Sequence, residues 1–135
     1  MPDKFYGMHW MLATPFFDNE EIDFKSIPQL VEHARKSRCT GIVGLGVMGE
    51  SARLTDIERT KVAESILESS QGIPVTLGTT ANSTKAVIDR SVEAEKLGAA
   101  AVMVSAPSMA KANLDALFGY YYRLAESIEI PIVMQ

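Results

Sequence analysis

Five short apolar segments recur along the chain about every 30 residues, and helical patterns follow the first four. The segments predicted as strands are residues 8–13, 42–45, 73–77, 99–104 and the start of a fifth at 131–135. The middle three are almost continuously apolar, which is typical of parallel strands that are covered on both faces. The chain is therefore predicted to be an α/β protein with a parallel sheet.

Local signals place the ends of the predicted helices. Asp23 is a candidate N-cap for the first helix, and Thr55 with Glu58 fits a capping box at the start of the second. Gly72 and Gly98 are predicted to end the second and third helices. The fourth helix carries an apolar stripe that predicts its buried face: Leu114, Leu117, Phe118, Tyr121, Leu124, Ala125 and Ile128.

Two architectures fit this alternation, a doubly wound sheet and a (β/α)8 barrel. The pattern stops on the first residues of a fifth strand, where a doubly wound domain rarely ends. A barrel needs about 250 residues, and 135 residues supply about half of one. We therefore predict the N-terminal half of a TIM barrel, with four β/α units plus the start of strand five. Residues 1–135 are expected to form a single partial-barrel domain.

Composition excludes several classes of function. The apolar fraction of 47% and the charged fraction of 22% are those of a globular protein. A net charge of −4 without a basic run argues against a nucleic-acid partner, and no apolar run approaches the roughly 20 residues of a membrane span. The single cysteine, Cys39, suits a reducing compartment, so a cytoplasmic protein is expected.

The glycine-rich segment 44–51 has the spacing of a dinucleotide-binding fingerprint, G-x-G-x-x-G. That fingerprint requires a helix at the third glycine and an acidic residue at the end of the next strand. Here the helix signal comes at Thr55, and the next strand ends Gly78-Thr79-Thr80 without a carboxylate. A nucleotide site remains an alternative that these two features disfavour.

Ligands of barrels meet the carboxyl ends of the strands. These ends carry hydroxyl and amide groups, and Glu50 is their one ionisable side chain. No metal-ligand cluster and no serine with a histidine partner occurs there, and His9 and His33 are assigned structural roles. The backbone N–H groups of the glycine-rich loop suit a carboxylate or a phosphate. A small anion is therefore the expected ligand, with no metal.

Four motifs in order resemble the dihydrodipicolinate synthase/N-acetylneuraminate lyase family. Residues 46–51 (G-V-M-G-E-S) resemble its G-T-T-G-E-S loop, and the others are Thr14-Pro15-Phe16, residues 54–58 (L-T-D-I-E), and Ile73-Pro74-Val75 through Gly78 to Asn82. The resemblance implies a (β/α)8 barrel acting on pyruvate or another 2-keto acid. Such enzymes are class I aldolases or dehydratases that need no cofactor and form a Schiff base with a lysine on strand six.

The resemblance also assigns roles to residues. Val47, Met48, Gly49 and Thr14 are expected to bind the keto acid, while Glu50, Ser51 and Asn82 shape the site. At the proton-relay positions of the synthases, Gln135 replaces a tyrosine and Val47 a threonine, and Met109 stands where a tyrosine reaches a neighbouring subunit. None of these three side chains can relay a proton.

The chain also lacks a counterpart of the Schiff-base lysine, because it ends within strand five. We therefore expect a divergent or truncated family member whose isolated 135-residue chain is inactive. The alternative is a non-catalytic half-barrel that self-associates or binds a small anion. A homo-oligomer is expected in either case, because the incomplete sheet leaves two unpaired edges.

Overall fold

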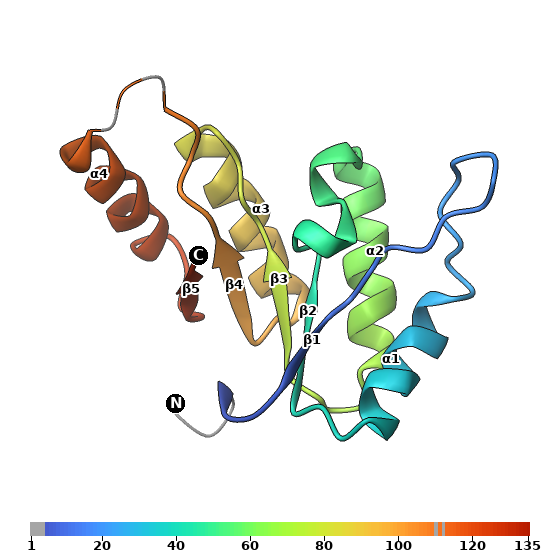
Figure 1. Ribbon diagram of the computed structural model, residues 1–135. Coiled ribbons are helices and arrows are strands. Elements are labelled where there is room, and N and C mark those ends of the chain that lie inside the picture. Colours follow the sequence, from blue (N-terminus) through green and yellow to red (C-terminus); the bar gives the residue numbers. More distant parts are fainter. Residues whose placement is uncertain (1–4, 110, 112) are drawn as a thin grey trace.

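A computed structural model describes residues 5–109, 111 and 113–135. Strands and helices alternate along the chain (Figure 1), as the sequence predicts. The elements are β1 (His9–Met11), α1 (Ile27–Lys36), β2 (Gly41–Gly44), η2 (Val47–Gly49), η3 (Ser51–Arg53), α2 (Asp56–Ser69), β3 (Val75–Gly78), α3 (Thr84–Leu97), β4 (Ala101–Val104), α4 (Leu114–Ala125) and β5 (Ile132–Met134).

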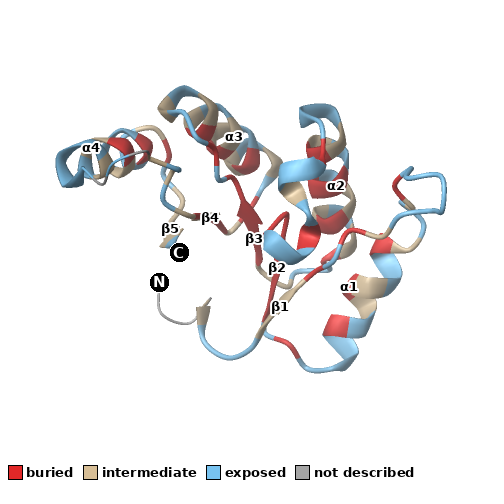
Figure 2. Cartoon of the chain, turned by 45° about the horizontal axis from the view of Figure 1, so that its top comes forward, coloured by how far each residue is buried: buried red, intermediate tan, exposed pale blue. Residues whose placement is uncertain are grey.

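The five strands form one parallel sheet in the order β1-β2-β3-β4-β5. Ile42 of β2 pairs with Trp10 of β1 and Val75 of β3, and Val102 of β4 pairs with Leu77 of β3 and Ile132 of β5. Figure 2 shows the helices as an arc outside the strands, open on one side. The core lies between sheet and helices, so the carboxyl ends of the strands remain available for a site.

Two of the predicted helix boundaries are confirmed by their hydrogen bonds and backbone angles. The hydroxyl of Thr55 accepts the N–H of Glu58 at 3.3 Å, and the Glu58 carboxylate accepts the N–H of Thr55 at 2.8 Å. Gly98 ends α3 in the left-handed conformation with φ 97°, which a residue without Cβ adopts at little cost.

Two other predicted boundaries are wrong. Asp23 is not the N-cap of α1, because the helix begins after Ser26. The Asp23 carboxylate instead accepts the N–H groups of Lys25 and Ser26 in the preceding turn. α2 ends at Ser69, so the first left-handed residue after it is Gln71, with Gly72 following.

The predicted buried face of α4 is partly right: Leu124 and Ile128 are buried and Leu117 and Tyr121 are half-buried, but the other predicted positions are exposed. Leu114 and Phe118 are 81% and 71% exposed, whereas Tyr120 and Leu124 are buried. Tyr120 sets this orientation by donating its hydroxyl to the carbonyl of Ala81, at 2.8 Å, in the loop after β3. Leu114, Phe118 and Tyr121 of the stripe border an open apolar hollow together with Met134 of β5, and the Tyr121 hydroxyl donates to the carbonyl of Val104 in β4 at 2.9 Å.

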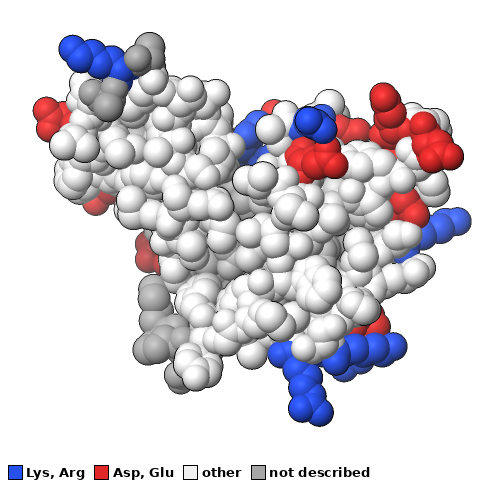
Figure 3. All heavy atoms as spheres, in the orientation of Figure 1, with Lys and Arg blue, Asp and Glu red and all other residues white. Residues whose placement is uncertain are grey.

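Charged side chains lie mainly around the edges of the face shown in Figure 3, and the middle of that face is uncharged. Within the described residues, no helix combines the length and the apolar character that crossing a membrane requires.

Candidate functional site

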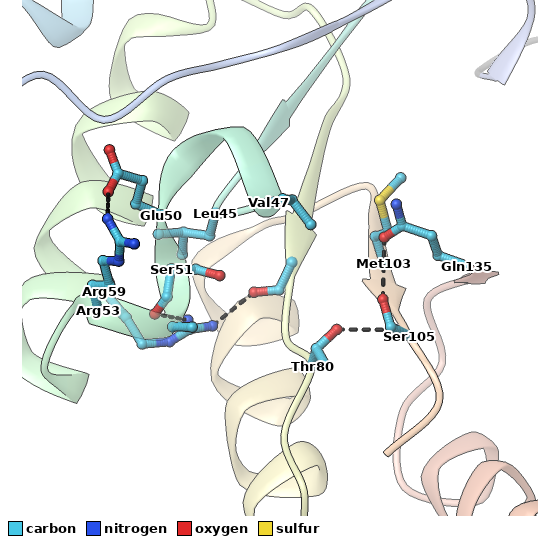
Figure 4. Close-up of a pocket in the computed structure, with 13 residues that line it drawn as sticks. Leu45, Val47, Glu50, Ser51, Arg53, Arg59, Thr80, Met103, Ser105 and Gln135 are labelled. Carbon is cyan, nitrogen blue, oxygen red and sulfur yellow. Dashed lines mark hydrogen bonds and ion pairs between the residues drawn. The ribbon is translucent and has the colours of Figure 1, made fainter. Parts of the chain in front are cut away.

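A cavity of about 530 Å³ opens at the carboxyl ends of β2, β3, β4 and β5. Its walls come from the glycine-rich segment, the start of α2 and the ends of the next three strands. Of the predicted site residues, Val47, Glu50, Ser51 and Gln135 line this cavity. In Figure 4, Ser51 and Arg59 lie on one side, and Ser105 with Gln135 lies on the other.

Two short 3₁₀ turns form the loop after β2. Gly46 is extended, and the first hydrogen bond of the turn runs from the N–H of Gly49 to the carbonyl of Gly46, at 3.0 Å. The N–H groups of Val47 and Met48 come before that of Gly49, at the start of the turn. Backbone N–H groups in this position suit an anion. The loop therefore has the donors that the sequence predicts for a carboxylate.

Residues with a strained backbone conformation lie near both ends of this loop. Leu45 and Glu50 both have positive φ, 56° and 52°. The left-handed region is unfavourable for side chains of this size, and such residues gather at functional sites. Glu50 joins the two turns, and its carboxylate forms an exposed ion pair with Arg53 at 2.8 Å.

The other predicted site residues lie around the cavity rather than on its walls. Thr14 is buried in the segment after β1, where its hydroxyl donates to the carbonyl of Gly49 at 2.7 Å. Met48 is exposed. Asn82 accepts the N–H of Ser108 at 3.1 Å and borders a separate hollow with Met109.

Three polar side chains connect the ends of β3, β4 and β5. The hydroxyl of Thr80 accepts the N–H of Ser105 at 2.9 Å, and the Ser105 hydroxyl donates to the amide oxygen of Gln135 at 3.2 Å. The sequence places all three at strand ends but does not predict this chain of hydrogen bonds. The amide of Gln135 is therefore hydrogen-bonded to the side chain of Ser105.

Arg59 is a cavity residue that sequence reasoning missed. Its guanidinium donates to the carbonyl of Ser51 at 3.0 Å and to the carbonyl of Gly78 at 2.7 Å. It thereby ties the loop to the end of β3. A signal was present, because Arg59 continues the helical spacing of the buried residues Val62, Ala63 and Ile66.

No group of three or more His, Cys, Asp and Glu side chains within residues 5–109, 111 and 113–135 could hold a metal ion. The cavity's hydrogen-bonding groups are instead backbone N–H groups, hydroxyls, an amide, the Arg59 guanidinium and the ion pair of Glu50 with Arg53. These groups suit a small, oxygen-rich anion.

Comparison with known proteins decides the family. The family model described as "Dihydrodipicolinate synthetase family" matches residues 4–134. The chain belongs to the dihydrodipicolinate synthetase family. Its similarity to 4-hydroxy-tetrahydrodipicolinate synthases reaches 37% identity over 124 residues for Oceanobacillus iheyensis and 34% over 131 residues for Coxiella burnetii. These matches cover 91% and 96% of this chain but 42% and 45% of the relatives.

Solved structures of the family have the same fold. The dihydrodipicolinate synthase of Aquifex aeolicus matches with a TM-score of 0.91 at 30% identity, covering 96% of this chain and 44% of that one. The chloride-inhibited synthase of Acinetobacter baumannii, in complex with pyruvate, matches with a TM-score of 0.91 at 32% identity, covering 95% and 44%. The predicted half of a TIM barrel is confirmed, and the chain spans less than half the length of these relatives.

Proposed function

We propose that the cavity binds the carboxylate of pyruvate or another 2-keto acid. The observation that carries this proposal is the 3₁₀ turn that begins at Val47, on the wall of the cavity, and continues through Met48. A similar synthase from Acinetobacter baumannii was solved in complex with pyruvate. In this proposal Val47 and Met48 donate N–H groups, while Thr14 and Gly49 hold the loop in shape.

The reaction expected of the family is aldol cleavage, aldol condensation or dehydration through a Schiff base. We infer that residues 1–135 form one partial-barrel domain that contributes binding groups but no imine-forming lysine. Within the described residues, every lysine is exposed and lies outside the strands. Val47 and Gln135 carry no proton that titrates near neutral pH. The isolated chain is therefore expected to bind the keto acid without converting it.

A single backbone donor can be removed to test this binding mode. Val47→Pro deletes one N–H at the first position of the turn, where proline is tolerated. Gly46 has φ −78° and ψ −168°, an extended conformation that suits a residue before proline. We expect about tenfold or greater loss of pyruvate affinity, the usual effect of losing a hydrogen bond to a charged group.

Val47→Ala is the matched control, since it keeps the N–H and should keep the affinity. Pyruvate titrations followed by NMR give both values. Unchanged affinity in a folded Val47→Pro variant would exclude this loop donor. Borohydride with pyruvate should trap no adduct on this chain, and a trapped adduct would overturn the inference about lysine.

Self-association is a second candidate function, which the exposed stripe of α4 favours. Leu114, Phe118 and Met134 border an open apolar hollow, and large exposed apolar patches commonly mark interaction surfaces. We infer that copies of the chain associate through this surface into a homo-oligomer. Sedimentation of a well-behaved monomer would count against it.

The buried, unpaired thiol of Cys39 is consistent with the expected cytoplasmic location.

A further inference from the structure

Arg59 is the one buried charged side chain among the described residues, with 5% exposure. Lysine, arginine, aspartate and glutamate are almost never fully buried without an opposite charge. Arg59 nevertheless lies against the cavity, one turn into α2. Its environment therefore has to explain why a cation is placed there.

The hydrogen-bond partners of Arg59 carry no net charge. Its guanidinium donates to the carbonyls of Ser51 and Gly78, and none of the ion pairs found in the described part of the chain includes it. Burial, with a smaller contribution from Arg90, lowers the pKa of Arg59 to about 10. The side chain thus remains charged at neutral pH.

The two carboxylates that raise the pKa of Arg59, those of Asp56 and Glu93, have other partners. Asp56 on α2 pairs with Arg90 at 3.0 Å, and Glu93 on α3 accepts the hydroxyl of Thr60 at 2.7 Å. Both oppose the lowering of the Arg59 pKa without cancelling it. A buried cation without a paired anion is unfavourable, so an anion in the adjoining cavity would improve its environment.

We propose that Arg59 supplies the positive charge that selects a carboxylate-bearing 2-keto acid over the neutral ketone of the same shape. The inference rests on the proposed function, because it assigns a charge to the same cavity. The loop N–H groups orient the carboxylate, and the guanidinium attracts it across the cavity wall. Arg59 also positions those N–H groups, since it holds the carbonyl of Ser51.

Pyruvate and pyruvamide separate charge from shape, because pyruvamide replaces the carboxylate with a neutral amide. We expect the wild-type chain to bind pyruvate at least about tenfold more tightly, as for a close charge pair beneath a protein surface. Arg59→Gln should abolish most of this preference, and Arg59→Lys should keep it. Lys61→Gln, an exposed charge on the same helix, is the matched control and should change neither affinity.

The outcomes distinguish this inference from the proposed function. A folded Arg59→Gln variant that keeps the preference, while Val47→Pro weakens pyruvate binding, overturns the role of Arg59 alone. A folded wild-type chain that binds neither ligand overturns both proposals. If Arg59→Gln does not fold, a folded Arg59→Lys variant decides, because losing the preference while keeping the charge would refute an electrostatic role.

Discussion

The backbone carbonyl of Leu45 lies so close to Gly78 that a Cβ atom on residue 78 would overlap it. Leu45 is itself fixed in a left-handed conformation at the start of the glycine-rich loop. The end of β3 and the loop after β2 are therefore in direct backbone contact. A glycine at position 78 is what permits this approach.

Gly78→Ala should destabilise the chain, because the obstructing atom is backbone and cannot rotate away. We expect a loss of about 1–3 kcal/mol, the usual effect of forcing an extra carbon into a packed site. Urea unfolding followed by circular dichroism measures it. Gly119→Ala is the control: nothing lies within 4 Å of its Cβ position in α4, so it should stabilise the helix by up to about 1 kcal/mol. Equal stabilities for the two variants would refute the steric argument.

Removing the hydroxyl of Thr14 should destabilise the glycine-rich loop, because this hydroxyl donates to the carbonyl of Gly49. Thr14→Val keeps the shape of the side chain but leaves the buried carbonyl of Gly49 without this donor. The expected cost is about 1–3 kcal/mol, and pyruvate affinity should fall with it. Thr14→Ser retains a hydroxyl and should recover most of both. If Ser and Val behave alike, the hydrogen bond has little effect.

The capping box of α2 should contribute a pH dependence. Hydrogen bonds from the backbone N–H and then the hydroxyl of Thr55 lower the pKa of Glu58 below its ordinary value. A lowered carboxyl pKa gives stability that is present above the unfolded-state pKa and is lost as pH falls through the folded-state value. The Tm should therefore decrease between about pH 5 and pH 3. Glu58→Gln should flatten that decrease, whereas Glu64→Gln, on the exposed side of the helix, should not.

Charges introduced on the exposed stripe of α4 should reduce self-association. Leu114→Glu with Phe118→Glu alters side chains that are already in solvent, so we expect smaller sedimentation coefficients at high concentration and an unchanged Tm. By contrast, Leu124→Ala removes a fully buried side chain and should cost about 2–5 kcal/mol. A double variant that sediments like the wild type would show that this surface is not involved.

The features predicted correctly from sequence are those that depend on local chemistry or on the repeat. The side chains of Thr55 and Glu58, three residues apart, each accept the backbone N–H of the other, so the sequence pattern alone identifies the cap. Asp23 and Ser26 are both capping residue types in the same turn, and the sequence does not show that the Asp23 carboxylate accepts the N–H groups of that turn instead of capping the helix. The left-handed conformation of Gln71 depends on the path of the chain from α2 into β3, which the sequence pattern does not show.

The prediction of the buried face of α4 failed at Leu114 and Phe118, because amphipathicity shows that a face is apolar but not which neighbour covers it. Tyr120, which the stripe does not include, is buried where its hydroxyl meets the loop after β3, a contact between residues far apart in sequence. Arg59 was missed for a related reason. Arginine is usually exposed, so its place on the inner stripe carries weight only once the carbonyls of Ser51 and Gly78 are known to converge on it.

The strictly sequential order of the strands has a consequence for folding during synthesis. Each strand pairs only with strands next to it in the chain, so the sheet can extend by one unit at a time without waiting for distant segments. The groups that hold the glycine-rich loop, Thr14, Arg59 and Gly78, all precede α3. A nascent chain could therefore set this loop once its third strand has docked, before the fourth and fifth strands leave the ribosome.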